Sequence, residues 1–278
     1  MGNLSKKSNE RIAAGLKRFQ PILSAAKARD VNESDTVVIV TDILQDIFGY
    51  DKYSEITSEH MIRGTFCDLA VKLNGELALL IEVKAIGLDL KDQFVKQAVD
   101  YAANQGVEWV VLTNGCLWRV YRITFSKPIE NELVIEFDLL SMNARTTNNI
   151  EVLGLLAKEG WQKAFLGDYA SQRQALSRFN MAALILSSPV LEILRREVRR
   201  LSPEVKIDLE QLKDVLQADV IKREVLEGEK ADIARKQVNK IASRALRAVK
   251  ASTPTKENEN ELTDAITETV VPEINNQN

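Results

Sequence analysis

The feature that most constrains the fold of this chain is an Asn74-Gly75 pair between two strand-like segments. Residues 66–72 and 76–84 are rich in apolar residues, which either alternate with polar ones or run continuously. An Asn-Gly pair between two such segments is a strong short-range signal for a β-hairpin. We therefore expect two antiparallel strands joined by a tight turn.

The segments after this hairpin follow helical and strand patterns in turn. Residues 88–105 have helical spacing and precede Gly106, a residue typical of helix C-termini. Residues 109–112 are almost wholly apolar, as in a strand buried on both faces, and residues 117–124 and 133–139 follow as further strands. Because a helix separates the hairpin from the buried strand, the strands on either side of it should be parallel. The predicted fold class is α/β, with a mixed sheet flanked by helices.

Two helices are expected before the hairpin. Residues 1–30 have helical spacing but contain Pro21, which predicts a kink or a division of that helix. A second helix should begin at Asn32 or Ser34, both suitable caps, and end near Phe48. Its apolar residues lie nearly all round the helix, which is typical of a buried one.

The pattern predicts three regions along the chain. Residues 1–145 should form the sheet domain with its N-terminal helix, residues 146–250 a helical region, and residues 251–278 an acidic, disordered tail. Breaks in the helical pattern lie near Gly167, Pro189 and Pro203.

Composition and charge narrow the choice of partners and location. The chain is 45% hydrophobic and 28% charged, as in ordinary soluble proteins, and its net charge of −3 gives no global positive field. Any nucleic-acid contact must therefore come from a local patch. Cys67 and Cys116 are too few for a disulfide scaffold and are expected to be buried thiols, which fits a reducing cytoplasm. No apolar run is long enough to cross a bilayer, so no membrane partner is expected.

The register of the hairpin decides whether Asp68 and Glu82 lie on one face of the sheet. A two-residue loop alone would place Asp68 opposite Ile81, with the two carboxylates on opposite faces. A three-residue loop that includes Leu73, or a β-bulge, would place Asp68 on the face of Glu82 and Lys84. The opposite face would then be wholly apolar, which favours this register. Its expected members are Cys67, Leu69, Val71, Leu77, Leu79, Ile81 and Val83.

Two carboxylates and an ammonium at the end of an apolar strand are costly to desolvate without a partner. A hard divalent cation is a suitable partner, because Mg²⁺ accepts carboxylates, a main-chain carbonyl (here that of Val83) and phosphate oxygens. Such an ion lowers the pKa of a bound water, and Lys84 beside it could orient or help deprotonate that water. The alternative for Glu82-Val83-Lys84 alone is an ordinary ion pair at a strand end.

An ordered series of segments resembles the PD-(D/E)xK nuclease domain at the N-terminus of type I restriction enzyme motor (R) subunits, and the related stand-alone predicted restriction endonucleases. The similarity runs from about Glu33 to Tyr121. Its segments are residues 32–36, 44–50, 67–70, 81–85, 97–102 and 112–121. The resemblance implies a restriction-endonuclease-like sheet core.

The resemblance also implies roles for residues of the site. Asp68 and Glu82 would bind the metal (Mg²⁺ or Mn²⁺), and Lys84 would be the catalytic lysine. Glu33 would be the additional acidic residue that many members of this fold carry. The alternative for Glu33 is a carboxylate that stabilises a helix N-terminus.

Gln97 and Tyr101 match the Q-x-x-x-Y element of the same family. Their i, i+4 spacing places both on one face of a helix, where they could contact the DNA backbone or brace the site. In the alternative, Tyr101 packs beside Phe94 and Ala98, and Gln97 stays at the rim.

A basic amphipathic segment lies at residues 229–250. Its cations could contact DNA phosphates, or its apolar side could pack on the rest of the domain or on a second copy of the chain. The candidate DNA-binding residues are Lys236, Lys240, Arg244 and Arg247.

The sequence departs from the motor subunits in one respect. They continue into a helicase, whereas this chain contains no G-x-x-x-x-G-K-[ST] phosphate-binding loop, so no ATP hydrolysis is expected. Target choice would then depend on a partner specificity subunit, on DNA structure or on the helical region, and a homodimer could supply two active sites.

The leading hypothesis is a divalent-metal-dependent DNA endonuclease of the restriction or defence type, which hydrolyses phosphodiesters with metal-activated water. The alternative is a catalytically silent nuclease fold that binds DNA or assembles a complex. An RNA-directed nuclease would use the same active-site chemistry.

Overall fold

The computed structural model describes the backbone of residues 4–62 and 65–252, and their side chains apart from residues 59–66 and 244–252. The chain divides into two compact units, Met1–Arg173 and Gln174–Asn278. The tail expected at residues 251–278 lies outside the described residues from residue 253 onward.

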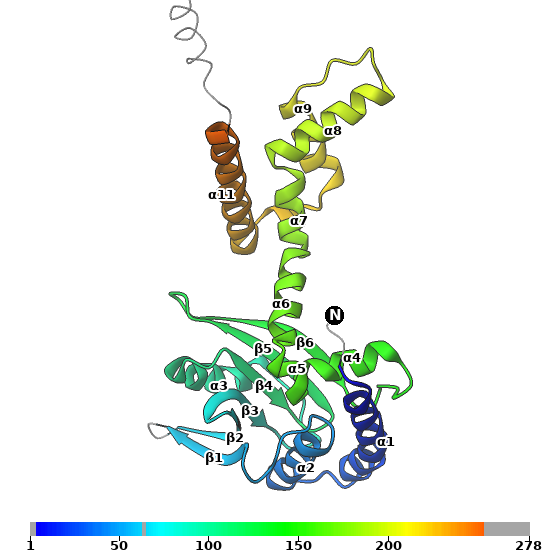
Figure 1. Ribbon diagram of the computed structural model, residues 1–278, viewed down its shortest axis with the longest axis vertical. Helices are drawn as coiled ribbons and strands as arrows, with labels where there is room; N and C mark the ends of the chain where they lie inside the picture. Colours follow the sequence, from blue (N-terminus) through cyan, green and yellow to red (C-terminus); the bar gives the residue numbers. More distant parts are fainter. Residues whose placement is uncertain (1–3, 63–64, 253–278) are drawn as a thin grey trace, which may run out of the picture. The chain divides into compact units, whose positions relative to one another are not determined.

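The first unit is built on a six-stranded mixed sheet with strand order β1-β2-β3-β4-β5-β6 (Figure 1). Only β3 and β4 pair in parallel, and α3 (Asp92–Gln105) connects them; the other four pairings are antiparallel. This confirms the predicted α/β class and its mixed sheet. The strands are β1 (Ile56–Ile62), β2 (Thr65–Leu73), β3 (Glu76–Val83), β4 (Trp109–Thr113), β5 (Leu117–Thr124) and β6 (Glu130–Asp138).

The hairpin between β2 and β3 contains both a tight turn and a bulge. Leu73 pairs with Glu76, so the loop is Asn74-Gly75 alone, with φ values of 53° and 84° that suit such a turn. The register shifts between Val71 and Lys72, which leaves one extra residue, Ala78, on β3. The predicted bulge is therefore present, and the three-residue loop is not.

The structure also corrects the prediction of which side chains lie on each face of the sheet. Leu69, Val71, Leu79, Ile81 and Val83 share one apolar cluster, as predicted. Leu77 lies before the extra residue in β3 and therefore packs on the opposite cluster, against α3. Cys67 belongs to that cluster as well, beyond the last β2–β3 register pair, Leu69–Ile81.

Helices cover both faces of the sheet. The α3 face is packed with residues such as Val95, Val99 and Tyr101. The other face is covered by α1 (Lys6–Ala28), α2 (Glu33–Asp46), α4 (Thr147–Leu156), α5 (Lys158–Gln162) and α6 (Phe165–Ala175).

The N-terminal helix differs from its prediction, because α1 is one element that continues through Pro21. The proline lies on the exposed side, while buried residues before and after it, such as Leu16 and Leu23, hold the helix on the core. The second helix, α2, is only partly buried: Val38 is 61% exposed.

The helices after residue 145 correct the expected domain boundary. Ile150, Leu153 and Leu166 are buried in the same cluster as α1 and α2, and the Tyr50 hydroxyl donates to the Leu156 carbonyl at 2.8 Å. Residues 146–173 therefore complete the first unit. Gly167 lies inside α6 and does not break it.

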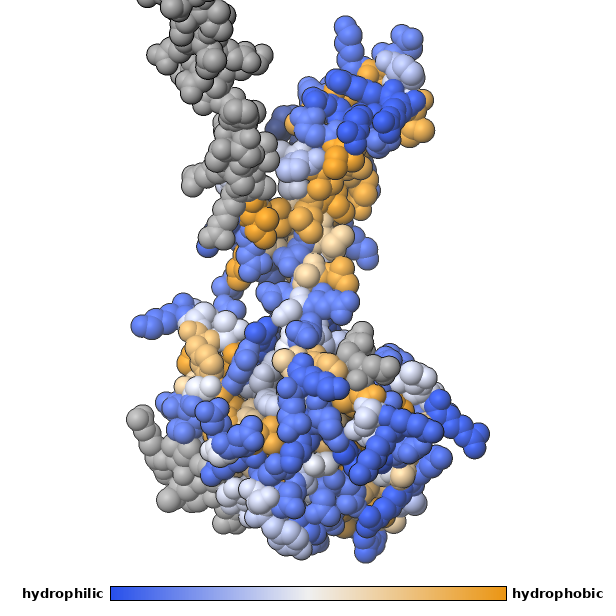
Figure 2. Space-filling model, viewed as in Figure 1, coloured by the Kyte–Doolittle hydropathy of each residue, from blue (hydrophilic) through white to orange (hydrophobic). Residues whose placement is uncertain are grey.

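The second unit is helical, as predicted, and its buried apolar core is small. It consists of α7 (Arg178–Ile185), α8 (Ser188–Leu201), α9 (Leu209–Val215), the π-helix η1 (Leu216–Val220), α10 (Arg223–Leu226) and α11 (Glu229–Ser252). Phe179 packs there against Ala183, Ala234 and Val238. In Figure 2 the α8–α9 end of this unit is mainly hydrophilic, and its apolar side chains gather nearer α7.

The contact between α1 and α2 predicts a strong effect of one glycine. A Cβ at Gly15 would lie 2.8 Å from Ile47 Cγ1 and 3.1 Å from the Asp46 carbonyl oxygen, whereas a Cβ at Gly167 would meet no atom within 4 Å. We expect Gly15→Val to lower the free energy of unfolding by about 2 kcal/mol or more through overpacking. Gly167→Val, the control in another helix, should change it by less than about 0.5 kcal/mol. Urea unfolding of both variants tests this, and equal effects would contradict the close approach.

Candidate active site

Asp68, Glu82 and Lys84 meet where β3 leaves the sheet. Asp68 Oδ2 accepts a hydrogen bond from the Val83 N–H at 2.7 Å, so its carboxylate lies against the end of β3. The Lys84 N–H donates to the Thr113 carbonyl at 2.8 Å and fixes the backbone of Lys84 to β4. Thus the hairpin positions one carboxylate, and the parallel pairing with β4 positions the other two residues.

Glu82 is the most deeply buried member of this group, at 4% exposure. Lys84 Nζ donates to Glu82 Oε1 at 2.8 Å and also lies 3.5 Å from Glu33 Oε2. The same ammonium lies 5.8 Å from the centre of the Phe94 ring in the first turn of α3. One cation therefore contacts side chains from β3, α2 and α3.

Burial and neighbouring charge shift the pKa values in this group. Burial is the largest influence on Glu82 and raises the pKa of its carboxyl; Asp68 and Glu33 add to this, and Lys84 opposes it. Burial acts to lower the pKa of Lys84, but the hydrogen bond to Glu82 and the surrounding negative charges outweigh it, so that pKa is raised. Lys84 is therefore a cation at neutral pH, suited to holding an anion or a water.

The Cys67 thiol lies beside the carboxylates but is not poised to react. Burial, followed by the negative charges of Glu82 and Asp68, raises its pKa to about 12. It donates to the Ile81 carbonyl at 3.2 Å. Cys116 is likewise buried, and burial raises the pKa of its thiol. Both are the buried thiols expected from the sequence.

Glu33 reaches the site from the start of α2. The side-chain cap of that helix is Asn32, whose Oδ1 accepts the Asp35 N–H at 2.9 Å. The carboxylate of Glu33 is thus not needed as the cap and contacts Lys84 instead.

Gln97 and Tyr101 lie on α3, as their spacing predicted. Tyr101 is 3% exposed and packs in the cluster that contains Cys67, and burial raises its pKa. Gln97 is exposed, one turn after Phe94. Both line a depression of about 320 Å³ whose lining residues all belong to α3.

Arg119 and Asn114 support the site, and the sequence analysis assigned them no role. Arg119 Nη1 donates to the Leu90 carbonyl at 2.6 Å, and Asn114 Nδ2 donates to the Leu88 carbonyl at 3.0 Å. These bonds attach the loop between Lys84 and α3 to β5 and to the turn before it. Both residues belong to the run 112–121 that carries the family resemblance, which was the available signal.

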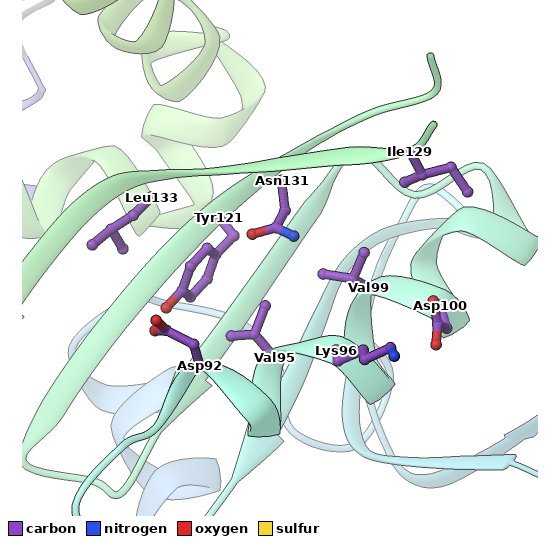
Figure 3. Close-up of a pocket in the computed structure, with 9 residues that line it drawn as sticks. All are labelled: Asp92, Val95, Lys96, Val99, Asp100, Tyr121, Ile129, Asn131 and Leu133. Carbon is purple, nitrogen blue, oxygen red and sulfur yellow. The ribbon is translucent and has the colours of Figure 1, made fainter. Parts of the chain in front are cut away.

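A larger hollow of about 610 Å³ lies between α3 and the strands β5 and β6 (Figure 3). Asp92, Lys96 and Asp100 supply charge there, and Tyr121 supplies an aromatic wall. None of Asp68, Glu82 or Lys84 lines it, so this hollow is separate from the carboxylate site.

The donor set at the end of β3 fits a hard divalent ion. Among the described residues, no three His, Cys, Asp or Glu side chains are grouped closely enough to hold a metal. Mg²⁺, however, needs only one or two carboxylates beside water and carbonyl oxygens. Burial raises the pKa of Glu82, and the neighbouring Asp68 carboxylate adds to this, so two carboxylates with few other charges to pair them lie close together there.

The sheet, its helices and the charged group at the strand end define an α/β fold of the nuclease-like class. Residues 39–134 match the family described as type I restriction enzyme R protein N terminus. This span contains Asp68, Glu82 and Lys84, and it begins after Glu33. Neither a curated protein nor a solved structure matches the chain.

Within the described part of the chain, no helix has both the length and the apolar character needed to cross a membrane.

The burial of Glu82 predicts a pH-dependent effect of its cation. Lys84→Met leaves a buried carboxylate without its ammonium and should lower the free energy of unfolding at pH 7 by about 2 kcal/mol or more. The folded-state pKa of Glu82 would then lie further above its unfolded value. The loss is therefore full above the folded pKa and shrinks as the pH falls towards 4. Denaturant unfolding at several pH values measures it.

Two further variants serve as controls. Glu82→Gln in the Lys84→Met background should restore most of the lost stability at pH 7, because no buried charge then remains. Lys96→Met removes a cation from an exposed position on α3 and should change stability by less than about 0.5 kcal/mol. A Lys84→Met loss that is equal at pH 4 and pH 7 would contradict the electrostatic explanation.

Proposed function

We propose that this chain is a divalent-metal-dependent DNA endonuclease of the restriction or defence type, with Asp68, Glu82 and Lys84 as its active site. The observation that carries the proposal is the almost fully buried Glu82 carboxylate, hydrogen-bonded to Lys84 and adjacent to Asp68. A buried carboxylate with a raised pKa and a specific charged partner is characteristic of functional sites. The match of residues 39–134 to a restriction enzyme domain supports the same conclusion.

In this proposal Asp68, Glu82 and the Val83 carbonyl hold Mg²⁺ or Mn²⁺. The ion would lower the pKa of a bound water and offset charge on the phosphodiester. The bond from the Val83 N–H holds the Asp68 carboxylate at the end of β3, beside the proposed ion.

Lys84 acts in its charged form, consistent with its raised pKa. Its ammonium would orient the attacking water and stabilise negative charge that develops on the phosphate. Glu33 holds that ammonium from the α2 side, at 3.5 Å. On the α3 side the Phe94 ring lies 5.8 Å from the same ammonium.

The substrate we propose is DNA, and the helical unit offers further contacts to it. Lys236 and Lys240 are exposed on α11 and could lie on phosphates; the side chains of Arg244 and Arg247 lie outside the described residues. Gln97 is exposed close to the first turn of α3 and could contact the backbone, whereas the burial of Tyr101 suits a bracing role. A second copy of the chain, or a partner specificity subunit, would direct cleavage; no ATP is required.

The proposal predicts metal-dependent nicking of supercoiled plasmid. Wild type with Mg²⁺ or Mn²⁺ should nick, and Asp68→Asn, Glu82→Gln and Lys84→Met should each lower the rate by about 100-fold or more, because each removes a group that acts on the reacting phosphate. Glu33→Gln should cost less, about tenfold, since it acts through Lys84.

The control is Asp100→Asn, an exposed carboxylate on α3, which should nick at the wild-type rate. If the wild type nicks plasmid with neither metal but still binds DNA, that result would support the catalytically silent binding module instead. Cleavage that survives Asp68→Asn and Lys84→Met would show that the site is misassigned. Faster cleavage of RNA than of duplex DNA would show that the substrate is RNA.

A further inference from the structure

The helical unit carries a second basic surface that the sequence analysis did not single out. Four arginines, Arg195, Arg196, Arg199 and Arg200, lie within six residues of α8. Their spacing of i, i+1, i+4 and i+5 places them on one side of the helix. We name this set the α8 arginine face.

The opposite side of α8 packs on the rest of the unit. Leu191 is buried at 4% exposure, and Leu194 and Val198 are partly buried beside it. This fixes which side of the helix is available to a ligand. The side chains of Arg196 and Arg200 are 63% and 68% exposed.

The local charge balance favours an anionic ligand. Residues 174–252 contain 16 Lys and Arg against 11 Asp and Glu, although the whole chain has a net charge of −3. Each of the four arginines on this face has a partner within the protein. Arg196 and Arg200 share Glu197, at 3.4 and 2.9 Å, Arg195 pairs with Glu192, and Arg199 donates to the Ile207 carbonyl at 3.4 Å. Exposed pairs of this kind contribute little, so a phosphate can replace the carboxylate.

The geometry suits a nucleic-acid backbone. Five residue steps along a helix cover about 7.5 Å at ~1.5 Å per residue. A duplex presents a phosphate about every 3.4 Å along each strand, so two to three phosphates lie within reach of the arginine side chains.

The composition of the unit favours duplex over single-stranded nucleic acid. Single strands are bound by stacking bases on aromatic side chains. Between residues 174 and 252 the one aromatic residue is Phe179, and it packs against Ala183, Ala234 and Val238. With no exposed aromatic platform in this stretch, the available interaction is with the backbone.

We infer that the α8 arginine face binds the phosphate backbone of duplex DNA without sequence preference and retains DNA on the chain that carries the carboxylate site. The inference rests on the proposed function in taking DNA as the substrate. It places the main electrostatic contact on α8, in addition to the α11 lysines.

The test is the binding of a fluorescein-labelled 30-base-pair duplex of arbitrary sequence to the full chain in EDTA, where no metal supports cleavage. Anisotropy titrations from 50 to 300 mM NaCl give the affinity and its salt dependence. Neutralising Arg196, Arg199 and Arg200 to Gln should weaken binding roughly tenfold or more at 100 mM salt and reduce the slope of log K against log salt by about 2 to 3.

The matched control neutralises Arg178, Arg223 and Lys230 to Gln, which removes the same charge from exposed positions of the same unit. For this control variant, the slope of log K against log salt should change by less than about 1. Equal losses in the two triple variants, or no loss in the α8 variant, would overturn the inference. Tighter binding of a single strand or of duplex RNA by wild type would do so as well.

A second readout distinguishes phosphate binding by these arginines from a purely structural role. Arg199 and Arg200 lie in the last turn of α8, where cations stabilise a helix. A structural role alone would lower the melting temperature seen by circular dichroism and leave the salt slope unchanged. That result would overturn the inference.

Failure of this inference and failure of the proposed function give different results. If the chain binds duplex through α8 but nicks no plasmid with Mg²⁺ or Mn²⁺, the catalytic proposal fails and the α8 inference stands. If the chain nicks plasmid and the α8 variant binds duplex as wild type does, the α8 inference fails and the catalytic proposal stands.

Discussion

The burial of the Glu82 carboxylate at the end of an apolar strand is the constraint around which the first unit is organised. β3 runs through the core, with Leu80 and Ile81 fully buried, and Glu82 continues that run at 4% exposure. A charge in such a place is destabilising unless it is paired, and its raised pKa reflects this. Lys84, two residues on, supplies the pairing charge. A fold that keeps such a pair in its interior gives up some stability relative to an apolar interior of similar volume.

Several tertiary contacts must agree before these charges can meet. The bulge at Ala78 sets the register that brings Asp68 against the Val83 N–H. The parallel pairing with β4 fixes the Lys84 backbone, and α3 places Phe94 beside the Lys84 ammonium. Arg119 holds the loop that links these two residues. The site therefore depends on two neighbouring pairings of the sheet, because the β2–β3 hairpin positions Asp68 and the β3–β4 pairing positions Glu82 and Lys84.

The features of the fold and the site that could be predicted from the sequence are those that a local sequence pattern encodes. The bounds of β5 and the buried β4 follow from their apolar patterns, and the bulge follows from the need to keep an apolar face. The continuity of α1 through Pro21 and the packing of residues 146–173 on the sheet depend on tertiary burial that no local pattern encodes. The same holds for Arg119, whose role is visible only when its carbonyl partner is known. Asp68, Glu82 and Lys84 could be grouped because the hairpin converts their sequence spacing into spatial proximity.

The net charge of the whole chain conceals a difference in charge between its segments. The net charge of −3 correctly excludes a global positive field, but it combines an excess of five positive charges in residues 174–252 with six acidic residues and one lysine in residues 253–278. Phosphate binding responds to the local potential within about a Debye length, roughly 8–10 Å, so the net charge of the whole chain does not decide whether a basic helix face attracts phosphate. The charge requirements of the two proposed activities also differ. The proposed catalysis at Glu82 needs a buried carboxylate. The proposed retention of DNA on α8 needs exposed cations that can exchange a carboxylate partner for a phosphate. Because the two requirements concern different environments, one chain can meet both.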